Sequence, residues 1–105
     1  MRKSGFMYIL SCSDGTYYTG STINLKRRLL QHQNGEGANY TRKRLPVVLE
    51  YFEEYDRVFH AFLREKQVQR WSRKKKEAFI TGHPELLPEL ARKIFRRWQA
   101  VTPSD

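Results

Sequence analysis

The chain has 105 residues and a net charge of +9, with 20 lysines and arginines against 11 aspartates and glutamates. Hydrophobic residues make up 39% of it, enough for one modest core. No apolar run approaches the roughly 20 residues of a membrane span, and the single cysteine, Cys12, excludes an intramolecular disulfide and a thiolate zinc site. The composition indicates one small, basic, cytoplasmic domain with an anionic partner.

The positive charge is concentrated in residues 57–76, which carry eight basic side chains and one acid, a local charge of +7. Residues 1–56 carry a net charge of only +2, and the basic and acidic side chains of residues 77–105 cancel. Such a block attracts polyanions and releases counterions when it binds DNA or RNA. We therefore expect a nucleic-acid partner; a solubilising helix face and an acidic protein partner are the alternatives.

The first half of the chain predicts a β-hairpin followed by a helix. Residues 6–12 and 16–22 are short aromatic and β-branched runs, typical of strands, and a tight-turn signal at 13–15 joins them. Asn24 is expected to cap a helix over residues 25–34, which a pair of glycines ends.

The second half predicts a third strand and three helices. A polar, glycine-bearing loop over residues 35–43 precedes a strand over 47–55. Asp56 and Ser72 are the expected caps of the next two helices. The expected helices end near Trp71, run over 73–80 and run over 85–99, followed by a tail at 101–105. The order β-β-α-β-α-α-α predicts an α/β fold of the α+β type: a three-stranded, mostly antiparallel sheet flanked by helices.

Helical geometry singles out Glu65, the one acid of the basic stretch. At 100° per residue it falls between Ala61 and Val58, so it points into the apolar sector of its helix. A buried carboxylate needs an arginine, hydrogen-bond donors or a metal ion as its partner. Glu65 is therefore either a structural ion-pair or helix-edge residue or a functional carboxylate.

The same geometry places Arg28 and His32 together, four residues apart on one helix face beside the apolar stripe, whereas Arg27 points away. A structural role and a joint functional role both remain open for this pair.

Three tyrosines, Tyr8, Tyr17 and Tyr18, crowd the predicted hairpin. Cross-strand packing explains most such clusters, but a tyrosine hydroxyl can also bind phosphate or move a proton. A three-residue loop puts Tyr8 and Tyr18 on one sheet face, and a two-residue loop puts them on opposite faces; we predict the former. Gly20 marks either a close backbone approach or a simple strand end.

These residues resemble the signature of the GIY-YIG nucleases. Phe6-Met7-Tyr8 and Tyr18-Thr19-Gly20 are similar to its two halves, at similar separation. The likeness covers roughly residues 5–83 and is greatest to small stand-alone bacterial members. It continues through Ser21-Thr22, Asn24-Leu25-Lys26-Arg27-Arg28, His32, Leu63-Arg64-Glu65-Lys66-Gln67 and Trp71-Ser72-Arg73.

The resemblance implies a hydrolytic endonuclease that cleaves phosphodiesters with a divalent metal, Mg²⁺ or Mn²⁺. By this resemblance Glu65 is the metal ligand and Arg28 holds the scissile phosphate. Tyr18 is the general base or orients the attacking water, and Tyr8 and His32 complete the phosphate and proton network. Gly20 is the signature glycine.

The resemblance also implies DNA as the substrate, structure- or damage-directed cleavage in repair or recombination, and no membrane partner; protein partners stay open. We expect residues 1–83 to form the nuclease-like domain and residues 84–105 a helical extension of it. Expected nucleic-acid contacts are Arg27, Arg64, Lys66, Arg70, Arg73, Lys74 and Lys75.

The chain departs from the family pattern at three places. Phe6 replaces the first signature glycine, and Thr19 stands where isoleucine or valine is usual. Many members also have an asparagine about a dozen residues after the glutamate, whereas no asparagine follows Asn39 in this chain.

Two other functions are open: a non-catalytic nucleic-acid-binding module, and an adaptor that docks on a nuclease complex through Trp71, Trp98 and the last helix.

Overall fold

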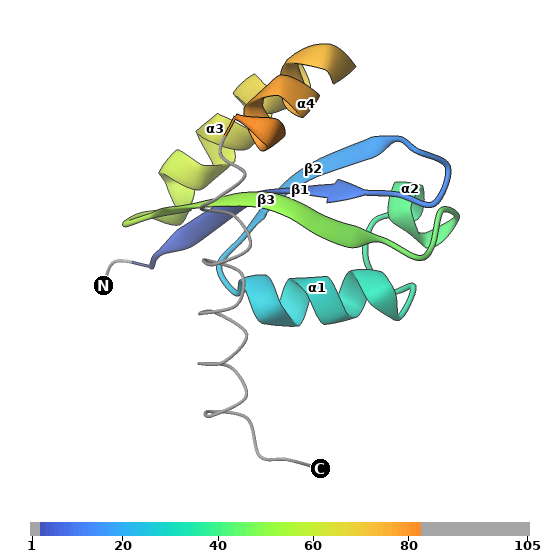
Figure 1. The fold of residues 1–105 in the computed structure, drawn as a ribbon. Helices are drawn as coiled ribbons and strands as arrows, with labels where there is room; N and C mark the ends of the chain where they lie inside the picture. Colours follow the sequence, from blue (N-terminus) through green and yellow to red (C-terminus); the bar gives the residue numbers. More distant parts are fainter. Residues whose placement is uncertain (1–2, 83–105) are drawn as a thin grey trace.

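Strand β1 (Gly5–Ser11) is the centre of a three-stranded sheet, between β2 (Tyr17–Thr22) and β3 (Val48–Tyr55), and both pairings are antiparallel. The computed structural model describes residues 3–82. Figure 1 shows α1 on one side of this sheet and α3 and α4 on the other. The helices are α1 (Leu25–Gln33), α2 (Asn39–Arg42), α3 (Val58–Gln69) and α4 (Arg73–Thr81).

The order β-β-α-α-β-α-α confirms the predicted α+β class, with one addition. Helix α2 lies inside residues 35–43, where we expected only a loop. Four residues are too few to show a helical hydrophobic period, so this turn of helix leaves no pattern in the sequence. The expected helix at 85–99 and the tail at 101–105 lie outside the described residues. None of the helices in residues 3–82 is long and apolar enough to cross a membrane.

The loop of the β1–β2 hairpin has three residues, as predicted. The Cys12 amide donates to the Thr16 carbonyl at 2.8 Å, and the Gly15 amide donates to the Cys12 carbonyl at 3.0 Å. Gly15 has a φ of 83°, the left-handed value that such loops require of their last residue. The resulting register puts Tyr8 and Tyr18 on the same face of the sheet.

Alternation along β1 sends its side chains into two separate cores. Tyr8 and Leu10 pack with the buried leucines of α1, whereas Met7 and Ile9 pack with Val68 of α3. These four side chains are each at most 1% exposed. The central strand is therefore covered on both faces, and each face meets a different helix layer.

Two of the three predicted helix caps are confirmed. The Asn24 side chain accepts the Arg27 amide of α1 at 3.0 Å, and Ser72 accepts the Lys75 amide of α4 at 3.1 Å. Asp56 as the cap of α3 is wrong, because that helix begins later.

Helix α3 begins at Val58 with Arg57 in the cap position and no side-chain cap. The Val58 amide donates instead to the Lys3 carbonyl, just before β1, at 2.8 Å. Gly5 packs so closely on Val58 that any Cβ there would overlap its backbone. A tertiary contact thus replaces the local cap, and local sequence rules do not detect it.

A partly buried carboxylate, Glu53, ties β3 to α3. It accepts hydrogen bonds from the Tyr51 and Tyr55 hydroxyls at 2.7 and 2.6 Å and from Arg64 Nε at 3.0 Å. Burial alone would raise the pKa of Glu53, but Arg64 and the two tyrosine hydroxyls outweigh it and lower that pKa. The network therefore stabilises the fold at neutral pH, and this stabilisation is lost as pH falls through the folded-state pKa.

We predict that Arg64→Ala lowers the free energy of unfolding by about 2 kcal/mol, because it leaves a largely buried carboxylate without its cation. Urea denaturation at neutral pH measures the change. Arg70→Ala, at an exposed position one turn and a half further along, is the matched control and should change little. Equal stabilities of the two variants would contradict a structural role for the Arg64–Glu53 pair.

Candidate active site

Tyr8, Tyr18 and His32 form an aromatic cluster on the α1 face of the sheet. The His32 ring lies 5.7 Å from the Tyr8 ring and 5.3 Å from the Tyr18 ring, between centroids. Gly20 pairs with Tyr8 across the two strands. A Cβ at Gly20 would lie 2.5 Å from the Tyr8 hydroxyl oxygen, so the Tyr8 side chain lies directly over the Gly20 backbone. Of the two interpretations of Gly20, the close backbone approach is confirmed.

Arg28 lies beside this cluster and is half-buried. Its guanidinium forms hydrogen bonds with the hydroxyls of Tyr8 and Tyr18. Burial by itself lowers the pKa of Arg28, but the Tyr8 and Tyr18 hydroxyls outweigh burial and the pKa is raised. Gln31 holds the guanidinium from the other side, accepting from Nη1 at 3.1 Å. Arg28 is therefore a fully charged group held in one orientation.

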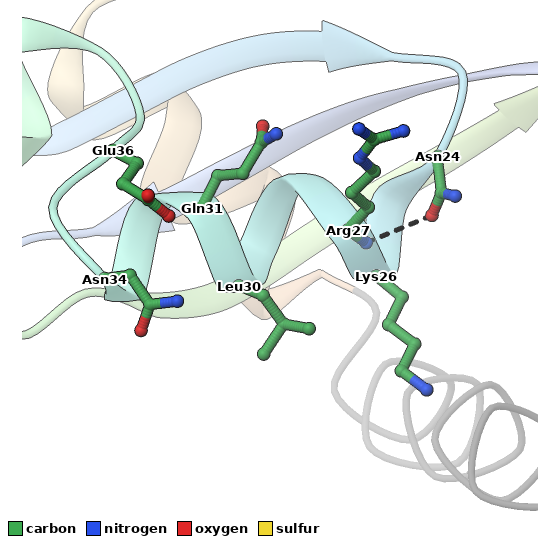
Figure 2. Close-up of a pocket in the computed structure, with 7 residues that line it drawn as sticks. All are labelled: Asn24, Lys26, Arg27, Leu30, Gln31, Asn34 and Glu36. Atoms are coloured by element: carbon green, nitrogen blue, oxygen red, sulfur yellow. Dashed lines mark hydrogen bonds between the residues drawn. The ribbon is translucent and has the colours of Figure 1, made fainter. Parts of the chain in front are cut away.

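Arg27 is exposed and its side chain points away from the tyrosine cluster, as helical geometry predicted. It lines a shallow surface pocket along α1 with Asn24 and Gln31, and Figure 2 shows Arg27 and Gln31 extending to the same side of the helix. Arg28, not Arg27, is the arginine of the tyrosine cluster.

His32 is fully buried and holds the Tyr8 hydroxyl. Its Nε2 lies 2.9 Å from that hydroxyl, and its Nδ1 lies 2.8 Å from Thr41 Oγ1 in α2. Burial, and then the Arg28 charge, lowers the pKa of His32 to about 4, so the ring is neutral at pH 7. With no exposed surface, His32 contacts the Tyr8 hydroxyl and is not itself open to a ligand.

Glu65 approaches β2 from α3 and is only 9% exposed, as its place on the helix predicted. Ser21 Oγ donates to one carboxylate oxygen at 2.5 Å, and Gln69 Nε2 donates to the other at 2.7 Å. Lys66 Nζ lies 3.5 Å from the second oxygen. Of the partners expected for this carboxylate, the structure shows hydrogen-bond donors, and it adds a lysine in place of an arginine.

Sequence reasoning missed four of these residues, Ser21, Gln31, Gln69 and Thr41. Gln69 and Gln31 had a signal, because Gln69 follows Glu65 by four residues and Gln31 follows Arg28 by three, so each shares a helix face with its partner. Ser21 and Thr41 had none, because their partners lie on other elements.

Glu65 and the tyrosine cluster meet around one edge of the sheet. Ser21 faces α3, while Tyr18 and Gly20 face α1, because side chains alternate along β2. Strand β2 is an edge strand, so no further strand separates its two faces from solvent. The Glu65 charge is one of the causes that raise the pKa of Tyr8, although burial is the largest. A carboxylate and a guanidinium thus flank one strand edge.

The oxygen atoms at Glu65 suit a hard cation. They belong to the Glu65 carboxylate and to the Ser21 hydroxyl, and Mg²⁺ prefers oxygen ligands. Across residues 3–82, no group of three or more histidine, cysteine, aspartate or glutamate side chains could hold a metal ion. A single carboxylate with water and phosphate oxygens is a common way to bind Mg²⁺, so the residues present fit this ion.

The basic side chains do not all remain available for nucleic acid. Arg64 is committed to Glu53 and is only 22% exposed, so we remove it from the expected contacts. Arg73 is exposed but pairs with Glu77 at 2.7 Å. Trp71, expected on an adaptor surface, is half-buried: it packs on Phe79 with ring centroids 5.2 Å apart and also lines a surface pocket with Lys66 and Arg70. The exposed members of the expected set are Arg27, Lys66, Arg70, Arg73, Lys74 and Lys75.

The burial of His32 predicts a pH-dependent stability. Its pKa in the folded chain is about 4 against an ordinary 6.5, so between these values the unfolded chain binds more protons. The free energy of unfolding therefore rises with pH across this window, by about 3 kcal/mol from this group. Urea denaturation as a function of pH measures the rise. It should shrink in His32→Gln and persist in His60→Gln, an exposed control; persistence in both would contradict the buried neutral ring.

Comparison with known proteins gives this geometry a family. The model of the GIY-YIG catalytic domain matches residues 4–78. A UPF0213 protein of Halobacterium salinarum is 47% identical over 74 residues, which cover 70% of this chain and 96% of that protein. A UPF0213 protein of Streptococcus agalactiae is 46% identical over 83 residues, covering 79% and 94%.

Two solved structures share the fold. The solution structure of a UPF0213 protein from Bacillus halodurans is 36% identical, with a TM-score of 0.51, and covers 79% of this chain and 88% of that one. The solution structure of a protein from E. faecalis is 37% identical, with a TM-score of 0.53, and covers 80% and 91%. The strand-edge site therefore lies in a catalytic domain of known type, and the chain belongs to the GIY-YIG family, among its small UPF0213 proteins.

Proposed function

We propose that this protein is a metal-dependent endonuclease that hydrolyses phosphodiester bonds in DNA. The observation that carries the proposal is the placement of the Glu65 carboxylate and the Arg28 guanidinium on the two faces of edge strand β2. Phosphodiester hydrolysis places negative charge on the phosphoryl oxygens and on the leaving oxygen. A cationic group and a carboxylate that holds a metal ion, on the two faces of one strand edge, match that charge distribution.

Arg28 binds the scissile phosphate in this proposal. A guanidinium presents its donors in a planar fork that contacts two phosphate oxygens at once, which a lysine cannot reproduce. Gln31 and the two tyrosine hydroxyls already orient Arg28, so little reorganisation is needed when the phosphate arrives.

Tyr18 orients the attacking water or accepts its proton, while Tyr8 remains a neutral phenol. Burial raises the pKa of Tyr8 to about 12, so Tyr8 is a poor candidate for an ionised base at neutral pH. Tyr18 is half-buried, and its hydroxyl lies beside the Arg28 guanidinium that binds the phosphate in this proposal, so it is placed to contact the attacking water.

Glu65 would hold the divalent ion, Mg²⁺ or Mn²⁺. When bound, such an ion supplies electrostatic stabilisation of the transition-state charge. Ser21 and Gln69 orient the carboxylate through one hydrogen bond to each oxygen. Since no asparagine follows Asn39, we infer that Gln69 provides the amide that orders this side of the site.

The proposed substrate is DNA of unusual structure, such as a branched, nicked or damaged duplex, in cytoplasmic repair or recombination. Residues 1–83 form the proposed nuclease domain, and 84–105 its extension. Positive charge along α3 and α4 provides sequence-independent affinity for the phosphate backbone.

We predict that Glu65→Gln and Arg28→Ala each lower the cleavage rate by roughly a hundredfold or more, because each removes a group that acts on transition-state charge. Cleavage of branched and linear DNA is measured with Mg²⁺, with Mn²⁺ and with a chelator. Glu54→Gln, an exposed acid on β3, is the matched control and should cut like the wild type.

The outcomes separate the candidate functions. Metal-dependent cutting that Glu65→Gln abolishes, with DNA binding retained, supports the enzyme. Equal weak cutting by the wild type and both variants would indicate a contaminant, and binding without cutting would favour the non-catalytic module.

A second prediction concerns the basic surface. The double variant Arg70→Ala, Lys74→Ala should reduce the slope of log affinity against log salt by up to about 2, because each lost phosphate contact removes about 0.9. Filter-binding titrations across a salt series measure the slope. The charge-matched control Lys3→Ala, Arg57→Ala removes two exposed cations at the other end of α3 and should retain it. Identical slopes in the two double variants would contradict an interface at Arg70 and Lys74.

A further inference from the structure

Thr41 lies behind His32 and is fully buried. Its Oγ1 lies 2.8 Å from His32 Nδ1 and 3.1 Å from the carbonyl oxygen of Ala38. Gly37 closes over the same side of the ring, because any Cβ there would overlap His32 Nδ1. The imidazole is thus held by α2 and the loop before it on its Nδ1 side, and by Tyr8 on its Nε2 side.

The contacts of Thr41 determine where the ring proton lies. A threonine hydroxyl has one proton, and Thr41 donates it to the Ala38 carbonyl. The short contact between Thr41 Oγ1 and His32 Nδ1 then requires that Nδ1 carries a proton and donates it. Since His32 is neutral at pH 7, its Nε2 is unprotonated and accepts the Tyr8 hydroxyl proton at 2.9 Å.

The reverse arrangement is unfavourable. If Nε2 carried the proton, the N–H groups of His32 and Arg28 would both point at the Tyr8 oxygen. The Tyr8 hydroxyl proton would then need another acceptor, and water cannot readily supply one because Tyr8 is only 1% exposed. A buried hydroxyl proton without an acceptor destabilises the fold by about 1–3 kcal/mol.

We infer that Thr41 is a positioning residue: it holds His32 as the Nδ1–H tautomer and so directs the Tyr8 hydroxyl proton toward His32. The lone pairs of the Tyr8 oxygen are then left to accept from the Arg28 guanidinium, which they help to hold in place for the phosphate. The effect of Thr41 on the cleavage rate rests on the proposed nuclease function, whereas its effect on the His32 tautomer does not.

Nitrogen-15 NMR of the imidazole ring tests the tautomer directly, because protonated and unprotonated ring nitrogens have well-separated chemical shifts. We expect Nδ1–H in the wild type and in Thr41→Ser, and a shift toward Nε2–H in the near-isosteric Thr41→Val. Thr81→Val, which removes an exposed hydroxyl from α4, is the control and should leave the ring unchanged. The Nε2–H tautomer in the wild type, which needs no variant to fold, or an unchanged ring in folded Thr41→Val, would overturn the inference.

Cleavage assays test the consequence. Thr41→Val should lower kcat by roughly tenfold to a hundredfold with unchanged affinity for DNA, and Thr41→Ser should restore kcat. A changed tautomer with an unchanged kcat would overturn the positioning role and leave the nuclease intact. If the wild type does not cut DNA, the nuclease proposal fails, and the NMR result alone decides the inference on Thr41.

Discussion

The close approach of the Tyr8 side chain to the Gly20 backbone is the constraint on which the candidate site depends. Because Gly20 has no side chain, the Tyr8 hydroxyl reaches across edge strand β2 to the region where Arg28 and Tyr18 also lie. The same strand presents Ser21 on its opposite face to Glu65 of α3. Edge strand β2 thus carries residues of the candidate site on both of its faces.

The site and the scaffold use their charges differently. In the scaffold, Arg64 and Glu53 neutralise each other in an ion pair, and this pair stabilises the packing of α3 on β3. In the site, Arg28 is matched mainly by neutral hydroxyls and an amide, so its charge remains available to an anion. Glu65 is likewise held by a hydroxyl, an amide and one lysine 3.5 Å away. Incomplete neutralisation is what distinguishes the candidate site from the structural ion pair in this fold.

Much of the fold was predictable because its signals are local. The hairpin loop, the caps Asn24 and Ser72 and the inward position of Glu65 follow from turn chemistry, capping and the 3.6-residue period. The start of α3 and the existence of α2 were missed, since the first depends on the Lys3 carbonyl and the second is a single turn around a buried hydroxyl. The start of α3 depends on a contact between segments distant in sequence, and α2 is too short to show a helical period.

For the candidate site, the sequence by itself determined the chemical types and the helix faces: a lone acid pointing inward, an arginine and histidine four residues apart, and tyrosines in a hairpin. Only the tertiary structure decided which partners they meet. The contacts of Ser21 with Glu65 and of Thr41 with His32 result from packing, as does the ion pair that binds Arg64 to Glu53. The physical reason is that periodicity specifies the direction in which a side chain points, whereas burial, hydrogen bonding and charge depend on what the rest of the chain brings to that place.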